Sequence, residues 1–393
     1  MTARIPHIML VAGEPSGDAL GGELMEALLS LTGGAVRITG VGGPNMIGHG
    51  LTSVFPMSDT SVMGPREVIP RLPLILRRVR ETAAFAIAEK PDVLVIIDSP
   101  DFTHMVAKRV AKRAPDIKIA NYVSPSVWAW RRGRARAMAK YIDRVLALLP
   151  FEPDFFRAEA HLDCVYVGHP AIERIPLAGE GARFREARGI APDAPILLLL
   201  PGSRTNEVKR LVQTFGDTAA LLAAETPGLK FVVPTVPHVS HLVEEAVKSW
   251  AVPVELVEGE TEKRAAFAAA TAALAASGTV SLELGLAGVP MVVAYKIDAI
   301  AAWAVSRMLK VPSVVIVNLI LDKPSVREFL QFAAKPQALA AALRPLLRDT
   351  PERARALTEL QQLRDIMGVG GERPSLRAAR AVLEMLPLDN PKT

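Results

Sequence analysis

The chain has 393 residues, of which 50% are hydrophobic and 22% charged, a balance that excludes disordered, collagen-like and coiled-coil proteins. Lys and Arg outnumber Asp and Glu by 46 to 41, and the resulting charge of +5 suits phosphate groups or an anionic membrane surface without implying nucleic acid. The single cysteine, Cys164, excludes a disulfide framework and a C-x-x-C site, so we expect a cytoplasmic protein.

Neither a secretory signal nor a spanning helix is predicted. The first apolar run, Ile8 to Ala12, is cut short by Gly13 and Glu14. The longest uncharged stretch, residues 265–282, is mostly alanine and is interrupted by Ser277-Gly278-Thr279. The mean hydropathy of +0.25 is nevertheless high for a cytosolic protein and leaves room for apolar surface beyond the core.

Short β-rich runs alternate with helical patterns in two successive series, which predicts parallel sheets with crossover helices. The runs of the first series are Ile8–Val11, Arg37–Val41, Val93–Ile97, Ile117–Val123 and Val145–Leu149. Those of the second are Ile196–Leu200, Phe231–Val233, Val254–Val257, Ala272–Ala276 and Met291–Ala294. We therefore expect an α/β protein with two Rossmann-like, doubly wound domains facing a cleft.

The domain boundary is expected near residue 170, where Gly168-His169-Pro170 precedes a stretch rich in Gly, Ala and Pro. This divides the chain into domains 1–170 and 171–345. The Arg-rich helical segment 346–393 is expected to cross back and pack on the first domain.

The first strand ends in Gly13-Glu14-Pro15-Ser16-Gly17-Asp18. Ligands of open parallel sheets bind at this carboxyl edge, where helix amino termini offer unpaired N–H groups. We expect Glu14, Ser16, Gly17 and Asp18 to contact a sugar, although Asp18 could equally serve as a helix N-cap. The spacing is not that of a dinucleotide or P-loop motif.

Two further strand ends carry candidate groups. Gly40 to Asn45 contains three glycines, which would let a phosphate or sugar approach the main chain. Asp98-Ser99-Pro100-Asp101 places two carboxylates just past a buried strand, where partial desolvation would suit a general base. We favour Asp98 for that role, because Asp101 could merely cap the following helix.

Tyr122 to Trp130 follows the fourth strand and holds two of the four tryptophans. Ser124 and Trp128 could contact a sugar or acyl chain, but core packing explains the aromatic residues equally well. The basic run that follows could meet lipid phosphates or be a solvated helix face. It comprises Arg131, Arg132, Arg134, Arg136, Lys140 and Arg144.

Two strand ends in the second half suit a diphosphate. Ser203-Arg204 follows the first strand of that half, and a guanidinium can form bidentate hydrogen bonds to a diphosphate. Ser277-Gly278-Thr279 forms a strand-to-helix turn whose amides could neutralise phosphate, while Glu283 could accept hydrogen bonds from ribose. An ordinary helix cap is the alternative.

Residues 63–79 mix apolar side chains with Arg66, Arg71, Arg77 and Arg78 and contain three prolines. We interpret this stretch as a poorly helical membrane contact or acyl groove, or as a connecting segment.

Together these motifs, with Leu149-Pro150-Phe151-Glu152, resemble the lipid-A-disaccharide synthase family from about residue 8 to the Gln337 region. The run Tyr-Val-Ser-Pro-Ser-Val-Trp-Ala-Trp at 122–130 is the most specific part of the likeness. One departure is Pro15, where the family usually has alanine; it removes no chemical group.

The resemblance implies an inverting glycosyltransferase with the B-type architecture. Its donor would be UDP-2,3-diacylglucosamine and its acceptor 2,3-diacylglucosamine 1-phosphate (lipid X), giving UDP and the β(1→6) disaccharide of the lipopolysaccharide anchor. By resemblance Asp98 would be the base, Arg204 and the 277–279 turn would hold the diphosphate, and Glu283 the ribose. Asn318 and Gln331 also match family motifs and would line the donor pocket.

No Asp-x-Asp occurs in the chain, so a paired-carboxylate metal site is not evident and we expect metal independence without a cofactor. Because both substrates carry acyl chains, we expect peripheral contact with the cytoplasmic face of the inner membrane of a Gram-negative bacterium, sensitive to charge reversal at Arg77 and Arg78. The sequence leaves open whether the protein forms a homodimer.

Two alternatives remain at this point. The chain could be another transferase, or a 2-epimerase, of the same fold that uses UDP-N-acetylglucosamine. It could also be a non-catalytic protein that binds a nucleotide sugar or lipid, because fold alone does not prove chemistry.

Overall fold

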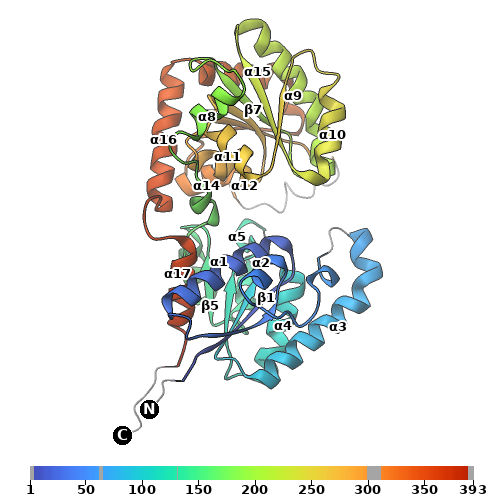
Figure 1. Cartoon of the computed structure of the whole chain (residues 1–393), viewed down its shortest axis with the longest axis vertical. Helices are drawn as coiled ribbons and strands as arrows, with labels where there is room; N and C mark the ends of the chain where they lie inside the picture. The colour runs from blue at the N-terminus through green and yellow to red at the C-terminus, as the bar shows by residue number, and fades with distance from the viewer. Residues whose placement is uncertain (1–3, 62–64, 131, 299–310, 388–393) are drawn as a thin grey trace. The chain divides into compact units, whose positions relative to one another are not determined.

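The computed structural model describes residues 4–61, 65–130, 132–298 and 311–387 (Figure 1). The chain forms two compact units. The first unit comprises Met1–Pro170 with Gly370–Thr393, and the second comprises Ala171–Val369. Met63 and Arg131, which belong to two predicted motifs, lie outside the described residues.

The sheet of the first unit contains six parallel strands in the order β2-β1-β3-β4-β5-β6. The strands are β1 (His7–Ala12), β2 (Arg37–Val41), β3 (Val93–Ile97), β4 (Lys118–Tyr122), β5 (Arg144–Ala147) and β6 (Asp163–Tyr166). After β2 the chain returns to the other side of β1, so the strand order reverses between β1 and β3. The loops that follow these two strands diverge there, which is where ligands of such sheets bind.

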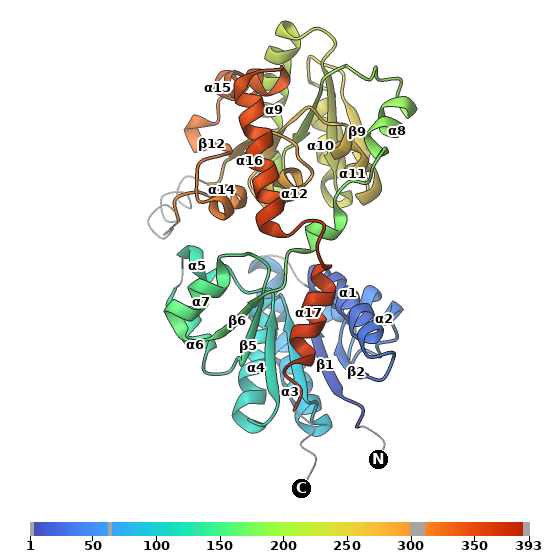
Figure 2. The same ribbon diagram turned by 90° about the vertical axis from the view of Figure 1, so that its left-hand side faces the viewer.

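Helices cover both faces of this sheet, which explains why β3 at its centre is apolar throughout. One face packs against α3 (Pro65–Glu89), α4 (Pro100–Arg113), α6 (Gly133–Met138) and α7 (Glu152–Ala160). The other packs against α1 (Pro15–Leu31), α2 (Pro44–Gly48) and α17 (Pro374–Leu383). Figure 2 shows α17 beside α1. The predicted return of the C-terminal helix to the first domain is therefore confirmed.

The interpretation of residues 63–79 as poorly helical was wrong. From Pro65 onward the segment belongs to α3, although Pro70 and Pro73 lie inside this helix. These prolines are the sixth and ninth residues of the helix, beyond its first turn, so each removes one main-chain hydrogen bond, whereas the second half of α3 is free of proline. Buried Ile75 and Val79 then hold the helix on the sheet. No helix among the described residues has the length and apolar character needed to cross a membrane.

The second unit contains another six-stranded parallel sheet, in the order β12-β11-β10-β7-β8-β9. Its strands are β7 (Ile196–Leu200), β8 (Lys230–Thr235), β9 (Glu255–Glu258), β10 (Ala272–Ala276), β11 (Met291–Tyr295) and β12 (Arg327–Leu330). Counted within this unit the order is 3-2-1-4-5-6, that of a Rossmann domain, and it reverses between β7 and β10. The predicted α/β class with two doubly wound parallel sheets is confirmed.

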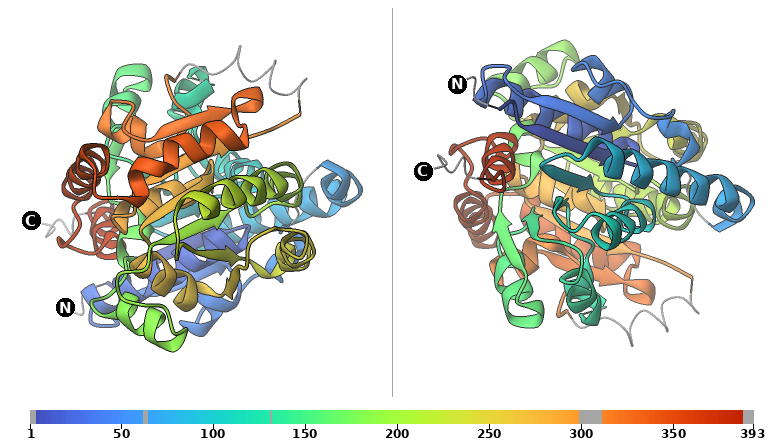
Figure 3. Two further views of the ribbon diagram at one scale, coloured as in Figure 1. Left: turned by 90° about the horizontal axis from the view of Figure 1, so that it is seen from above. Right: turned by 90° about the horizontal axis from the view of Figure 1, so that it is seen from below.

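Helices again cover both faces of the second sheet. One face packs against α9 (Thr205–Glu225), α10 (Pro237–Val247) and α15 (Pro336–Leu343). Helices α9 and α15 lie side by side, as the left-hand view in Figure 3 shows. The other α-helices among the described residues of this unit are α8 (Glu180–Ala187), α11 (Glu260–Ala269), α12 (Thr279–Leu286), α14 (Ile316–Leu321) and α16 (Pro351–Met367).

The chain was predicted to cross back to the first domain from residue 346 onward, and this position is too early. Helix α16 packs against α12 and α14 of the second unit, and Leu360, Leu363 and Met367 on it are buried. Only from Gly370 onward does the chain rejoin the first unit. A break at Pro351 marks the start of α16 and not a change of unit.

Candidate active-site loops

Two hydrogen bonds join the loops that follow β1 and β3 at the switch point of the first sheet. The Ser16 hydroxyl donates to Asp98 Oδ2 over 2.7 Å. The Ser99 hydroxyl donates to Glu14 Oε1 over 3.1 Å. Three of the residues predicted from separate motifs, Glu14, Ser16 and Asp98, therefore lie together at the carboxyl edge of the sheet.

The backbone at this edge is held in an uncommon conformation. Asp98 and Ser99 have φ angles of 50° and 44°, in the left-handed region that side chains other than glycine rarely adopt. The turn is fixed by the Thr103 hydroxyl, which donates to the Asp98 carbonyl over 2.7 Å. Gly13 is required beside it, since a Cβ there would come within 2.8 Å of Ser99 Oγ. Such strain persists where the surrounding structure enforces it, most often at functional sites.

The carboxylates of this edge influence one another. Burial raises the pKa of the Glu14 carboxyl, and the nearby charges of Asp98 and Asp101 raise it further, while the Ser99 hydrogen bond acts in the opposite sense. Asp98 is half-buried, and Asp101 is exposed in the first turn of α4. The loops thus place Asp98, a carboxylate with a serine donor, beside Glu14, a second carboxyl group whose pKa is raised by burial.

The prediction that Asp18 and Gly17 contact a sugar is not supported, because both have structural tasks. Asp18 is 1% exposed, and its two oxygens accept four hydrogen bonds from Gly43, Asn45 and Met46 at the start of α2. Gly17 is buried, and a Cβ there would lie 3.0 Å from the Ile97 carbonyl, so the glycine lets α1 approach β3. Asp18 therefore caps α2, a helix that is not its own.

The aromatic loop after β4 is anchored within its own unit. Val123 has a φ of 69°, a conformation that is unusual for a β-branched residue. Ser124 donates to the Pro125 carbonyl. The Trp128 indole packs edge-to-face on Phe151, with 5.0 Å between ring centroids, and its Nε1 donates to Glu152 over 3.3 Å. Both Ser124 and Trp128 remain half-buried, so each keeps some surface for a ligand.

Glu152 is a buried carboxyl that we did not single out as a site residue from the sequence. It accepts hydrogen bonds from the Leu149 amide and from Trp128, and it holds the aromatic loop to the turn after β5. Burial raises the pKa of Glu152 from 4.5 to about 7. Between these two pH values the folded protein holds a proton that the unfolded chain has released, so stability falls as the pH rises.

We expect Glu152→Gln to flatten the pH dependence of stability. In the wild type, ionisation of Glu152 should lower the free energy of unfolding by roughly 3 kcal/mol between pH 4.5 and pH 7, at about 1.4 kcal/mol per pH unit. Glutamine has no proton to lose, so this decrease should be absent from the variant. Urea unfolding at several pH values in this window measures it, with Glu159→Gln on the same helix as control. Equal slopes for wild type and Glu152→Gln would contradict the assignment.

In the second unit, the loop after β7 is organised by Glu207, a carboxylate in the first turn of α9 that we did not list as a site residue. Glu207 is buried; it accepts a hydrogen bond from the Ser203 amide and pairs with the Arg204 guanidinium over 2.7 Å. Gly202, at φ 126°, leaves room for it, since a Cβ there would lie 2.6 Å from the Glu207 Cβ. Most of the Arg204 side chain stays exposed and can reach an anion.

The turn after β10 presents the amino terminus of α12. The Ser277 hydroxyl donates to the Val314 carbonyl, and Ser281 donates to the Gly278 carbonyl. Space next to Gly278 is open, because a Cβ built there meets no atom within 4 Å. The amides of Gly278 and Thr279 therefore lie at a site that a bulky anion can approach.

Glu283 does not stand alone. Its carboxylate pairs with Lys263 of α11 over 3.1 Å, and both residues line a small pocket of about 230 Å³ together with Pro176 and Phe267. Lys263 was not predicted as a site residue, because the sequence of α11 is typical of a charged surface helix. Glu283 can still accept hydrogen bonds, since its side chain is only partly covered.

Asn318 is buried and fully engaged, which does not support its predicted place in the donor pocket. Its amide nitrogen donates to Ser313 and to the Val326 carbonyl, and its oxygen accepts from the Val326 amide. It therefore clamps the loops on either side of α14. Gln331, in contrast, is half-buried at the end of β12 with a φ of 52°, and its side chain is not committed in this way.

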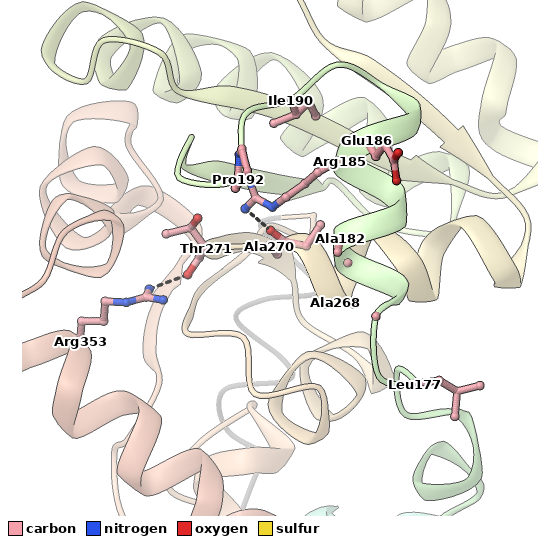
Figure 4. Close-up of a pocket in the computed structure, with 13 residues that line it drawn as sticks. Leu177, Ala182, Arg185, Glu186, Ile190, Pro192, Ala268, Ala270, Thr271 and Arg353 are labelled. Carbon is pink, nitrogen blue, oxygen red and sulfur yellow. Dashed lines mark hydrogen bonds between the residues drawn. The ribbon is translucent and has the colours of Figure 1, made fainter.

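A hollow of about 820 Å³ lies elsewhere in the second unit, close to the start of β10 (Figure 4). Two arginines line it, but their guanidinium groups are used by the main chain. Arg185 donates to the carbonyls of Ala191, Ala194 and Ala269, and Arg353 donates to those of Thr271 and Leu346. This hollow is at the amino edge of the sheet and is separate from the candidate loops.

No cluster of His, Cys, Asp and Glu suited to a metal ion occurs in the part of the chain that the structure describes. The positive groups described at the candidate loops of the second unit are the Arg204 guanidinium, the main-chain amides at the start of α12, and Lys263 beside Glu283.

Solved structures share this fold at low sequence identity. UDP-GlcNAc 2-epimerase from Neisseria meningitidis, bound to UDP-GlcNAc, aligns with a TM-score of 0.63 at 12% identity, over 98% of this chain and all of its own. The glycotransferase of kitacinnamycin aligns with a TM-score of 0.60 at 20% identity, over 98% of this chain and all of its own. These likenesses establish the two-domain glycosyltransferase-B architecture.

Sequence comparison is more specific. A family model described as lipid-A-disaccharide synthetase matches residues 8–381. The lipid-A-disaccharide synthase of Rhodopseudomonas palustris (strain HaA2) is 49% identical over 389 residues, covering 98% of both chains. That of Nitrobacter hamburgensis is 50% identical over 380 residues, covering 97% of this chain and 96% of its own. The chain therefore belongs to the lipid-A-disaccharide synthase family of glycosyltransferases in lipid A biosynthesis.

Proposed function

We propose that the protein transfers a 2,3-diacylglucosamine unit from UDP to the 6-hydroxyl of 2,3-diacylglucosamine 1-phosphate. The observation that carries this proposal is the hydrogen-bonded pair of Ser16 and Asp98 at the switch point of the first sheet. A half-buried carboxylate with one oxygen occupied by a serine retains another for the proton of an alcohol.

In the proposed step, the acceptor oxygen attacks C1 of the donor sugar as its proton passes to Asp98. The bond between C1 and the diphosphate breaks, UDP leaves with the electron pair, and the configuration at C1 inverts. Glu14, Ser16, Asp101, Ser124 and Trp128 are the residues we assign to the acceptor sugar. Glu14 accepts from Ser99 through Oε1, so its other oxygen can accept a hydrogen bond from a sugar hydroxyl.

We assign the donor to the second unit. Arg204 and the main chain at Ser203 would hold the diphosphate together with the turn of Ser277, Gly278 and Thr279. Glu283 would accept from ribose and Gln331 would line the pocket. A protein of the same fold bound to UDP-GlcNAc supports a uridine nucleotide as the ligand class. Amides and a guanidinium that face developing charge need no reorganisation as the bond breaks.

Incubation of the purified protein with the two lipid substrates, with and without excess chelator, tests this proposal. We expect mass spectrometry to detect the disaccharide 1-phosphate at equal rates in both samples, because the leaving charge is carried by protein groups. A reaction without the acylated acceptor would instead favour a 2-epimerase. A large loss of turnover in chelator would contradict metal independence.

We also propose peripheral contact with the cytoplasmic face of the inner membrane, supported by the exposed Leu72 and Arg77 on α3. Arg78 is less suitable as a probe than its sequence position indicated, because it pairs with Asp59 and Glu81 within the fold. We expect Arg77→Glu to lower binding to anionic vesicles at low salt, with a smaller difference at high salt. Vesicle flotation measures this, and unchanged binding would contradict it.

A further inference from the structure

A groove of about 1090 Å³ lies in the first unit, beside the candidate loops. Its apolar lining includes the buried side chains of Leu51, Phe55 and Met57. Ile47 of α2 also lines the groove, although its side chain is 51% exposed to solvent. A concave site with an apolar lining of this kind is typical of ligand-binding grooves.

The groove is built by the second glycine loop, a motif that the proposed roles above leave unused. A Cβ at Gly43 would lie 2.6 Å from the Met57 side chain, and one at Gly42 would lie 2.9 Å from that of Leu51. The two glycines therefore let segment 51–58 pack against the end of β2. The Ser53 hydroxyl fixes the segment, since it accepts from the Gly42 amide and donates to the Phe55 carbonyl.

The groove is continuous with the proposed acceptor site. Pro15 lines it, and the next residue is Ser16, which donates to Asp98. The same wall is tied to the loop after β1 by Thr60, whose hydroxyl donates to the Gly13 carbonyl over 3.1 Å. A sugar whose hydroxyl contacts Asp98 would therefore lie next to this apolar groove.

The rim of the groove carries a positive charge. Arg71 of α3 lines it and is exposed, and its guanidinium approaches the Ser58 carbonyl at 3.5 Å. No described carboxylate forms an ion pair with Arg71. An apolar groove with an exposed guanidinium at its rim is complementary to an amphiphile that has an anionic head and an apolar tail.

We propose that this groove holds an acyl chain of the acceptor, with Arg71 facing its phosphate. The proposal rests on the proposed function, because it takes the acceptor to be an acylated sugar phosphate. It assigns the specificity for acylated acceptors to residues 42–58 and Arg71, apart from the catalytic pair. A lipid of the surrounding membrane is the competing occupant.

Acceptors whose chains grow by two methylenes at a time, starting from the deacylated sugar phosphate, provide the test. For the wild type, kcat/KM should rise with chain length, by up to about fourfold for each fully buried methylene. Ser58 also lines the groove and is exposed, so Ser58→Trp should fill it, while Ile47→Asp makes its wall polar. Both substitutions should flatten this rise. Neither should change kcat/KM for the shortest acceptor that is turned over.

Ile366→Asp is the matched control, because Ile366 is an apolar side chain with 45% exposure on α16 of the second unit. It should keep the wild-type slope, and all variants should keep the wild-type melting temperature. If one groove variant unfolds, the other carries the test.

Three results would overturn the groove assignment: a wild-type slope in both groove variants, an equal loss on every acceptor, or lost binding to phosphatidylglycerol vesicles with an unchanged slope. The last would identify the surface as a membrane contact. In all three the wild type is still active, whereas a wild type that forms no disaccharide would refute the proposed function itself.

Discussion

Asp98→Asn is expected to reduce kcat by about 10²–10⁴-fold, the range that a positioned general base contributes. The amide oxygen of asparagine can still accept the Ser16 hydrogen bond, so the loop should keep its geometry while losing its proton acceptor. UDP affinity should be unchanged, because the donor is assigned to the second unit. Steady-state kinetics with calorimetric titration of UDP measures both effects.

Asp101→Asn is the control for this prediction, since Asp101 is a nearby carboxylate that is exposed in the first turn of α4. It should lower kcat much less than Asp98→Asn does. If the two variants lost the same activity, Asp98 would not act alone. If Asp98→Asn kept full turnover, the base would have to be another group. Only an inactive wild type would indicate a binding protein without catalysis.

Arg204→Ala is expected to lower kcat by about 10²–10³-fold, the loss seen when one preorganised donor to a developing anion is removed. UDP binding should weaken as well, because the diphosphate keeps its charge in the product. Arg204→Lys should recover only part of the loss, since an ammonium group cannot make two parallel hydrogen bonds to a diphosphate.

Arg157→Ala is the control. Arg157 pairs with Asp154 three residues away, and its side chain is 75% exposed, against 74% for Arg204. The two arginines match in exposure and in the spacing of the pair, but Asp154 is exposed whereas Glu207 is buried. The loss of an exposed ion pair by itself should change little. A similar effect of both substitutions, or an Arg204→Ala variant with wild-type kcat, would exclude Arg204 from the donor site.

The central strands of both sheets could be predicted because their burial on two faces leaves near-continuous apolar runs. Val93–Ile97 and Ile196–Leu200 match β3 and β7 residue for residue. The two strands without a prediction, β6 and β12, lie at sheet edges. Their sequences, Asp-Cys-Val-Tyr and Arg-Glu-Phe-Leu, mix polar and apolar residues, since an edge strand is covered less completely.

For the candidate site, the sequence located the loops but did not separate ligand-binding residues from structural ones. Glu14, Ser16 and Asp98 come together as parallel-sheet topology requires. Asp18 and Asn318 are also polar residues in predicted motifs, yet the fold uses them to satisfy main-chain groups. A polar residue near a strand end can bind a ligand or support the main chain. Only the number of hydrogen bonds that it forms within the fold distinguishes these two roles.

The residues that support the site escaped prediction for a related reason. Glu207 follows Arg204 by three residues, a spacing that could have indicated an ion pair in the first turn of a helix. Glu152 and Lys263 gave no such signal, because their partners, Trp128 and Glu283, lie 24 and 20 residues away along the chain. Such contacts depend on tertiary packing.

The most direct test of the donor site is hydrogen exchange of the full-length protein with and without UDP. We expect UDP to slow exchange of the main-chain amides at 202–208 and 278–282, where the guanidinium loop and the start of α12 lie. Protection confined to the glycine loop at 40–45, or absent from both segments of the second unit at saturating UDP, would contradict the assignment of the departing nucleotide to Arg204 and these amides.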